Sequence, residues 1–595
     1  AAARAIARGK VVAVKGVGGF HLMVAAHDGR AVRRLRDLKR REEKPFAVMF
    51  PSVEEIRGVC QVSPGEERLL YSPEAPIVLL QRIQSASPAL QIADEVAPGN
   101  PNLGALLPST PLHHLLLRLV GFPVVATSGN ISDEPICIDE REAVDRLGEI
   151  ADVFLIHNRP IVRHVDDSIA RVILGREQIL RRARGYAPLP VQISDRQASN
   201  RFQPETSASK PEVILAVGGH LKNSVALSIG ENVFLSQHIG DLETEKAFAA
   251  HRKVTGDLQK LYEATPGCIA ADAHPDYLST KFANEIAQAA GIPLIEVQHH
   301  VAHVLACMAE NELEAPVLGV SWDGTGHGPD GTIWGGEFFS ISETGCDRVA
   351  YLRPFRLPGG NRAIKEPRRS AIGLLYELYG KAAFQMKHLP LLRSFKDGEL
   401  ETLKHMLERG LNSPCTSSAG RLFDAVSGLI GLQQQMQFEG QAAMALEALL
   451  RGTSGNGAYD FELAGADFSA AETGEKAGWT DSRSPSRLVL DWAPVIEGVL
   501  SDLKVDAAAA EISLKFHNAL ADAVVFVAKW AAIERVVVSG GCFQNRYLTE
   551  RVVQRLRAEG FRPYWHQRVP PNDGGISLGQ IVAAKRELKR RSRCV

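Results

Sequence analysis

Three histidines stand within five positions at the start of an apolar run, in the stretch EVQHHVAHVLACMAENEL. His299 and His303 are four residues apart, a spacing that on a helix places both imidazoles on one face, about one turn apart. That geometry suits a divalent metal, although an i,i+4 histidine pair alone does not select which metal. The competing interpretation is a polar helix start whose histidines cap the helix or face water. Other ligands are therefore needed to decide between the two.

Two aspartates in turns are candidates for those ligands. Asp323 follows an apolar strand in SWDGTGHG, and Asp573 lies in the turn of VPPNDGGISLGQ near the C-terminal end. Gly324 and Gly326 in the first of these turns allow backbone N–H groups to approach a phosphate closely, while an acidic side chain holds the accompanying cation. A Gly-rich hairpin loop without any ligand would explain this segment equally well.

Two shorter segments have the composition of nucleotide contacts. SGGCFQN, which contains Gly540, Gly541 and Asn545, predicts a strand that runs through a Gly-Gly turn into a helix whose N-terminus is free to receive an anion or a ribose. A close-packed strand–helix corner is the alternative. In FEGQAA, Glu439 beside Gly440 offers a carboxylate suited to ribose hydroxyls.

The N-terminal third carries a cluster of cations. LKRREEKPFAVMF gathers Lys39, Arg40, Arg41 and Lys44 just before an apolar strand. The segments ATSGN, HVDDSIAR and ILRRARGY add hydroxyls, amides and guanidiniums after other strands. Because arginine matches phosphate oxygens bidentately, these segments together predict a triphosphate cavity. A solvated basic helix end is the simpler interpretation of the first of them.

The hydrophobic patterns predict an α/β protein with two domains. Before residue 193, short β-branched runs such as KVVAVKG and FPVVATSGN alternate with helical patterns such as DGRAVRRLRDLKRR. Residues 193–212 are polar and rich in Ser, Gln and Pro, which predicts a linker between a domain at 1–192 and another at 213–595. Within the second domain a strand–turn–strand pattern starting at Val213 recurs about a hundred residues later, which predicts two similar lobes. The segment 452–486 is interpreted as a surface insertion.

Bulk properties exclude several classes of protein. The 595 residues carry a net charge of −1, which gives no indication of a nucleic-acid or membrane partner. No CxxC spacing occurs among the eight cysteines, so a zinc knuckle is not predicted, and scattered single cysteines are typical of reduced intracellular proteins. No signal peptide or membrane span is expected, and the start at Ala1 suggests a processed or cut piece of a longer protein.

The first domain resembles the YrdC family, which forms carbamoyl-type adenylates from ATP. By that resemblance the catalytic residues are Lys39, Arg41 and Lys44, and the nucleotide-binding residues are Lys15, Ser128, Asn130 and Arg181. The second domain resembles the TsaD-like carbamoyltransferases, which have a two-lobed ATPase fold of the actin/Hsp70 type. There the resemblance implies one divalent metal (iron, zinc or manganese) bound by His299, His303, Asp323 and Asp573. It implies nucleotide contacts from Gly324, Gly326, Glu439, Gly440, Gly540, Gly541 and Asn545.

Both domain types in one chain, with GGFHL, SQHIGDLET, HPDYLS, QHHVAH, GTIWGGEF, GRLFDAVSGL and EGQAA in order, are similar to the HypF family of [NiFe]-hydrogenase maturation. The resemblance implies a cytoplasmic carbamoyltransferase that uses ATP, Mg²⁺ and carbamoyl phosphate and releases AMP and pyrophosphate. The acceptor it implies is the C-terminal cysteine of HypE. Members of this family normally also carry an acylphosphatase-like domain and a zinc-finger segment, which we do not find in this sequence.

Three alternatives stay open at this point. A tRNA threonylcarbamoylation enzyme joins the same two domain types, and a small-molecule O-carbamoyltransferase would use a hydroxyl acceptor. A nucleotide-switched binding module of the Hsp70 type is the third, although such a switch needs no histidine pair. The near-zero net charge and, more strongly, the motifs SQHIGDLET and GTIWGGEF favour the HypF family over the tRNA enzyme.

Overall fold

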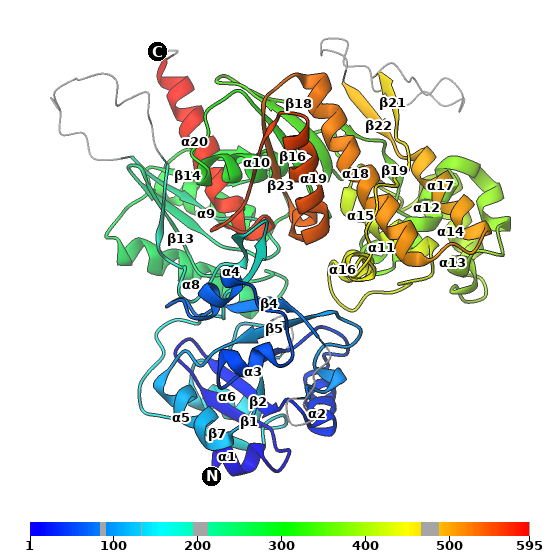
Figure 1. Cartoon of the computed structure of the whole chain (residues 1–595). Coiled ribbons are helices and arrows are strands. Elements are labelled where there is room, and N and C mark those ends of the chain that lie inside the picture. Colours follow the sequence, from blue (N-terminus) through cyan, green and yellow to red (C-terminus); the bar gives the residue numbers. More distant parts are fainter. Residues whose placement is uncertain (84–90, 132–133, 194–211, 466–486, 594–595) are drawn as a thin grey trace. The chain divides into compact units, whose positions relative to one another are not determined.

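The computed structural model (Figure 1) describes the chain except for residues 84–90, 132–133, 194–211, 466–486 and 594–595. The chain forms two compact units, unit 1 with Ala1–Val297 and His566–Val595, and unit 2 with Gln298–Trp565. Nearly all of the predicted linker lies outside the described residues, so the division at 193–212 stays a prediction. In the part of the chain that is described, no helix is long and apolar enough to cross a membrane.

Unit 1 begins with a mixed nine-stranded sheet in the order β7-β1-β2-β6-β3-β5-β4-β8-β9. Its strands are β1 (Val12–Lys15), β2 (Phe20–Ala25), β3 (Ala47–Met49), β4 (Ile77–Gln81), β5 (Asn102–Leu106), β6 (Val124–Ser128), β7 (Val153–Leu155), β8 (Ile169–Ile173) and β9 (Arg176–Arg181). The accompanying helices are α1 (Ala2–Ile6), α2 (Gly29–Lys39), α3 (Val53–Arg57), α4 (Pro64–Leu70), η2 (Asp94–Val96), α5 (Pro111–Val120) and α6 (Glu140–Leu147). The predicted alternation of strands and helices is confirmed.

Helix α2 places the first cation of the basic segment. Its N-terminus is capped by Asp28, whose carboxylate accepts hydrogen bonds from the backbone N–H groups of Arg30 and Ala31. Val32 and Leu35 are buried in the core of this sheet. The helix ends at Arg40 in the left-handed conformation (φ 50°), so the chain turns away directly after Lys39.

A second sheet of unit 1 has six strands in the order β10-β13-β12-β11-β14-β15. These strands are β10 (Pro190–Gln192), β11 (Val213–Ala216), β12 (Ala226–Ile229), β13 (Asn232–Leu235), β14 (Cys268–Asp272) and β15 (Leu294–Val297). The helices of this part are α8 (Glu245–Leu261), α9 (Leu278–Ala290), η5 (Asp573–Gly575) and α20 (Ile576–Arg593), and α20 packs against the sheet. A tight hairpin turn at Gly230 and Glu231 joins β12 and β13, which pair directly across it.

Unit 2 contains a seven-stranded sheet in the order β21-β22-β18-β17-β16-β23-β24 and a two-stranded sheet of β19 and β20. The strands are β16 (Val317–Trp322), β17 (Gly336–Ile341), β18 (Cys346–Leu352), β19 (Phe355–Arg356), β20 (Cys415–Thr416), β21 (Glu462–Gly465), β22 (Leu488–Asp491), β23 (Arg535–Ser539) and β24 (Arg562–Trp565). The helices are α10 (His299–Glu310), α11 (Asn361–Lys365), α12 (Pro367–Tyr379), η3 (Gly380–Gln385), α13 (Pro390–Arg393), α14 (Glu399–Arg409), α15 (Ala419–Leu429), α16 (Gln441–Leu449), α17 (Ala493–Lys504), α18 (Ala509–Ala531), η4 (Gly541–Gln544) and α19 (Arg546–Ala558).

The predicted near-repeat is confirmed by the strand pairing of these two sheets. Along β13-β12-β11-β14-β15 two antiparallel pairings are followed by two parallel ones. The same succession holds along β18-β17-β16-β23-β24. Within 452–486, interpreted as a surface insertion, Glu462–Gly465 forms an edge strand paired with β22. An edge strand needs hydrogen bonds on one side only, which permits the polar and Gly-rich composition of this segment. The rest of that segment, 466–486, lies outside the described residues.

Candidate active sites

The two histidines of the opening motif lie in the first two turns of α10, together with Asp323 from the end of β16. We name these three residues the His–Asp cluster. All three are buried, and their potential ligand atoms lie within 4.8 Å of one another. Asp323 Oδ2 is 2.9 Å from His303 Nε2 and 3.7 Å from His299 Nε2. The predicted i,i+4 pair is therefore a real side-chain pair, with ring centroids 5.0 Å apart.

Backbone N–H groups fix the orientation of the Asp323 carboxylate. Its Oδ1 accepts hydrogen bonds from the N–H of Gly324 at 2.7 Å and of Gly541 at 3.3 Å, so Oδ2 is left to face the imidazoles. Burial would raise the pKa of Asp323, but the hydrogen bonds and charges of His299 and His303 outweigh it and hold this pKa well below its usual range. The carboxylate is thus ionised and held in place by groups of the type that orient metal ligands.

The donor set of the His–Asp cluster fits a divalent metal. Two imidazole nitrogens and a carboxylate oxygen are ligands that zinc, iron and manganese accept. The fourth predicted ligand, Asp573, belongs to unit 1, where it is buried and begins η5. It lies beside the turn at Gly219, where an added Cβ would be 3.6 Å from its Oδ2. Its part in metal binding stays a prediction.

At the Gly-rich turns the backbone passes so close to neighbouring groups that no residue larger than glycine fits. A Cβ on Gly326 would lie 2.3 Å from His300 and 2.9 Å from His299. Gly540 has φ +97°, and a Cβ there would lie 2.2 Å from the Trp322 carbonyl oxygen. These glycines therefore shape the loops around the His–Asp cluster, whether or not they also contact a nucleotide.

Sequence reasoning did not single out three residues that lie at the same place. Ser418 donates from its hydroxyl to the carbonyl oxygens of Asp323 and Gly324, at 2.6 and 2.9 Å. Arg421 and Asp424, one turn apart on α15, form a buried ion pair at 2.7 Å. Burial raises the pKa of Asp424 to about 6. All three come from or adjoin the motif GRLFDAVSGL, which was noted only as a family motif.

The other predicted nucleotide residues of unit 2 are placed differently from one another. Glu439 is exposed, and Gly440 adopts φ 75° as the N-cap of α16. Asn545 is buried and caps α19 by accepting from the backbone N–H of Leu548, while its amide lies 2.9 Å from His517 Nε2. Its side chain therefore has a structural role, and its nucleotide role stays a prediction.

In unit 1 the basic segment forms a second candidate site, which we name the lysine cluster: Lys39, Ser128 and Asn130. Lys39 Nζ donates to the carbonyl oxygens of Ser128 and Asn130, at 2.7 and 2.9 Å, and to Asn130 Oδ1 at 3.1 Å. The side chain is nearly completely buried. Burial, followed by the charge of Arg41, lowers the pKa of Lys39 to about 7. Residues from α2 and from the end of β6 thus meet as predicted.

Not all of the remaining predicted cations lie at the lysine cluster. Burial and the nearby charge of Arg181 lower the pKa of Arg41, whose guanidinium donates to the carbonyl oxygens of Lys44 and Pro45. Lys44 is exposed. Lys15 is buried and forms an ion pair with Glu140. Its ammonium also donates to the carbonyl oxygens of His157 and Arg159, so these neighbours already satisfy its charge and hydrogen bonds. A nucleotide contact of Lys15 stays a prediction.

Family models of known proteins match nearly the whole chain. Residues 319–580 match the family "Carbamoyltransferase, Kae1-like Domain, second subdomain", and residues 209–310 match the "HypF Kae1-like domain". Residues 4–183 match the Sua5/YciO/YrdC family, described as "Telomere recombination". Carbamoyltransferase HypF of Synechocystis is 40% identical over 588 residues, which cover 97% of this chain and 71% of that protein.

Solved structures show the same similarity in three dimensions. The crystal structure of full-length HypF in the phosphate- and nucleotide-bound form aligns with a TM-score of 0.86 and 40% identity, over 98% of this chain and 85% of that one. The crystal structure of HypF from T. kodakarensis aligns with a TM-score of 0.87 and 29% identity, over 99% and 74% of the two chains.

Proposed function

The chain belongs to the HypF carbamoyltransferase family, and from this premise we propose that it uses ATP and carbamoyl phosphate to form carbamoyl-adenylate. The carbamoyl group then passes to the thiolate of the C-terminal cysteine of HypE, for cyanide-ligand synthesis in [NiFe]-hydrogenase maturation. The observation that carries this proposal is that one chain contains both a buried lysine cluster suited to a polyphosphate and a His–Asp cluster suited to a metal. The reaction takes place in the cytoplasm, without a nucleic-acid or membrane partner.

The first step belongs to the lysine cluster. An oxygen of carbamate, released from carbamoyl phosphate, attacks the α-phosphorus of ATP. The bond from that phosphorus to the oxygen bridging to the β-phosphate breaks, and pyrophosphate leaves with Mg²⁺. Lys39 and Arg41 neutralise the developing negative charge, supported by Lys44 and Arg181. Because Lys39 is held by the carbonyl oxygens of Ser128 and Asn130, its side-chain nitrogen is in place before the nucleotide binds.

The second step belongs to the His–Asp cluster. The HypE thiolate attacks the carbamoyl carbon, the bond from that carbon to the phosphate oxygen breaks, and AMP leaves. His299, His303 and Asp323, with Asp573 as the fourth ligand, would hold a metal, which would supply a Lewis acid and a template for the adenylate phosphate. Gly324 and Gly541 orient Asp323 through their N–H groups. Carbamoyl-adenylate is a mixed anhydride that water hydrolyses, so both steps need shielding from solvent.

The test is to identify the acceptor. Purified HypE, tRNA and a small-molecule alcohol are incubated separately with this chain, ATP, Mg²⁺ and carbamoyl phosphate, and each is analysed by mass spectrometry. We expect one carbamoyl group on HypE, and none on HypE whose terminal cysteine is replaced by alanine. Carbamoylation of tRNA or of the alcohol, with HypE unchanged, would contradict the proposal and favour one of the two rival transferases.

A further inference from the structure

The motif GTIWGGEF contains a buried carboxylate that neither step described above uses. Glu337 is the second residue of β17 and is completely buried, and its Oε2 accepts from Nε of Arg348 on β18. The Arg348 guanidinium carbon also lies 3.9 Å from the ring centroids of Trp334 and Tyr351. Burying two charges costs desolvation free energy that offsets much of their attraction. Stability alone therefore gives little reason for an ion pair at this place.

The second oxygen of the same carboxylate binds two loop segments. Glu337 Oε1 accepts from the backbone N–H groups of Gly335 and Gly336, at 3.2 and 3.3 Å, and from the hydroxyl of Ser417. Ser417 directly precedes the N-cap of α15, which is Ser418. The ion pair is thus connected to the start of β17 and to the start of α15.

These two segments hold the backbone of the metal ligand Asp323 from both sides. The Asp323 N–H donates to the carbonyl oxygen of Gly335 at 2.8 Å. On the other side, the Ser418 hydroxyl donates to the Asp323 carbonyl oxygen at 2.6 Å. Both holding groups, Gly335 and Ser418, are direct neighbours in the chain of groups that donate to Glu337 or donate to it themselves.

The packing around this turn leaves little room for an independent movement. A Cβ on Gly335 would lie 2.6 Å from the Asp323 carbonyl oxygen, and a Cβ on Gly336 would lie 2.3 Å from the Ser417 carbonyl oxygen. The Trp334 N–H donates to the carbonyl oxygen of Gly326, at the far end of the same turn, at 2.8 Å. A shift at the start of β17 would therefore be passed on to the turn that carries Asp323.

We propose that Glu337 and Arg348 are positioning residues of the metal site. Their buried ion pair fixes the two segments that hold Asp323, and so keeps the Asp323 carboxylate turned toward His299 and His303. All of these residues belong to unit 2. The inference rests on the proposed function, because it assumes that the His–Asp cluster binds a metal.

The test replaces Glu337 by glutamine in the full chain. Glutamine has nearly the same shape, but one carboxylate oxygen becomes an NH₂ group, which only donates. Since Arg348, Gly335, Gly336 and Ser417 all donate to Glu337, the amide opposes a donor in either orientation. The probe is Co²⁺ added to metal-free protein, because its visible absorption reports the coordination geometry. We expect the Kd for Co²⁺, measured by competition with a chelator, to rise by about 10–100-fold, with a changed absorption spectrum.

Two further variants separate positioning from a general loss of stability. Ser417→Ala removes one donor to Glu337 but keeps the ion pair, and should raise the Kd for Co²⁺ by about threefold to tenfold. Asp491→Asn is the matched control, because it breaks another ion pair of the same sheet, with Arg353 at 2.9 Å. That pair lies outside the two segments that hold Asp323, so Tm should fall while the Kd for Co²⁺ stays within about twofold of the wild type.

The outcomes distinguish this inference from the proposed function. If the wild type binds no Co²⁺, or if His303→Ala binds it with unchanged Kd and spectrum, the proposed metal site itself is wrong. If His303 is required but Glu337→Gln and Ser417→Ala both keep the Kd and spectrum of the wild type, the positioning role is overturned. An equal rise in Kd in Asp491→Asn would overturn it as well. Should Glu337→Gln not fold, an unchanged Kd in Ser417→Ala alone decides against the inference.

Discussion

The lysine cluster and the His–Asp cluster are both buried, but their charges are arranged in opposite ways. Around Lys39, burial and the like charge of Arg41 lower the pKa of the ammonium to about 7 and outweigh the opposing charge of Asp166. Around Asp323, two imidazoles stabilise the ionised carboxylate. A bound anion relieves the repulsion between neighbouring cations, whereas an ionised carboxylate beside two imidazoles suits a cation. From this difference we expect the polyphosphate at the lysine cluster and the metal at the His–Asp cluster.

The largest effect we expect comes from removing a member of the His–Asp cluster. His303→Ala should lose the metal and abolish carbamoyl transfer to HypE, while ATP–pyrophosphate exchange stays within about twofold of the wild type. Changes to residues that merely support metal ligands cost ~10–100-fold, so loss of a ligand should exceed that range. Elemental analysis and the two activity assays measure these quantities. His405→Ala, at an exposed position of α14, is the control, and full metal occupancy in His303→Ala would show that the pair is not a metal site.

The reciprocal change is Lys39→Ala. It should reduce ATP–pyrophosphate exchange by ~100–1,000-fold, as removal of one preorganised charge-stabilising group does, and leave the metal content unchanged. The loss has a physical reason beyond the charge, because the Asn130 side chain loses its ammonium partner. Arg30→Ala, an exposed position at the start of the same helix, serves as the control. An exchange rate within about twofold of the wild type would support the interpretation of this segment as a solvated helix end.

A smaller effect, on the pH dependence of ATP binding, tests the same difference between the two clusters. With a pKa of about 7, Lys39 is mostly neutral at pH 8.5 in the absence of ligand, so binding a triphosphate there requires proton uptake. We expect KM for ATP to rise about tenfold between pH ~7 and ~8.5. Lys39→Arg, which stays charged, should remove most of that dependence. A rise in KM of the same size in Lys39→Arg would show that Lys39 is not the titrating group.

The same pKa shift predicts how the free energy of unfolding changes with pH. The folded-state pKa of Lys39 lies below the ordinary lysine value of 10.5, so between about pH 7 and 10.5 the unfolded chain binds the extra proton. The contribution of this group to the free energy of unfolding therefore rises with pH through that window. Titration of ATP-free protein by thermal unfolding across this range, compared with Lys39→Arg, measures it.

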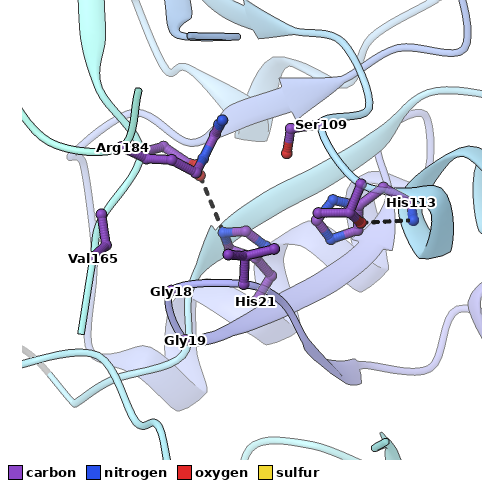
Figure 2. A pocket seen from close by; sticks show the side chains of 10 residues that line it. Gly18, Gly19, His21, Ser109, His113, Val165 and Arg184 are labelled. Carbon is purple, nitrogen blue, oxygen red and sulfur yellow. Dashed lines mark hydrogen bonds and ion pairs between the residues drawn. The ribbon is translucent and has the colours of Figure 1, made fainter. Parts of the chain in front are cut away.

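Local patterns in the sequence predicted much of this molecule. The α/β class, the family, the histidine pair on a helix and the repeated strand–turn–strand pattern are confirmed. Each was predictable because it depends on residues close in the chain or on motifs in a fixed order. Contacts between distant segments were not predictable in the same way. His21 and Asp167 are 146 residues apart. They meet because the segment before β8 runs beside the turn between β1 and β2, where the Val165 N–H donates to the Gly18 carbonyl oxygen at 2.8 Å (Figure 2). Single-sequence patterns contain no information on that contact.

Two local patterns are compatible with more than one structure or role. The polar and Gly-rich composition of 452–486 predicts a surface insertion, and within it Glu462–Gly465 pairs with β22 as an edge strand. Asn545 was assigned to nucleotide binding by family resemblance, although an asparagine directly before a helical pattern is also a typical N-cap. The choice between these two roles depends on what its side chain contacts, which the chain around it does not specify.

The smallest effect we expect tests that choice directly. Asn545→Ala removes the acceptor for the Leu548 N–H and the partner of His517, whose pKa burial lowers to about 4. Loss of a cap costs ~1–2 kcal/mol, which predicts a decrease in Tm of about 2–4 °C for the unfolding transition of unit 2. Asn545→Asp keeps the cap acceptor and should lose less. In neither variant should carbamoyl transfer at saturating ATP, or the metal content, change by more than about twofold, because the side chain is turned into the helix end. A large increase in the nucleotide KM with Tm unchanged would reverse this assignment and make Asn545 a ligand contact, which would extend the second site from the His–Asp cluster to the start of α19.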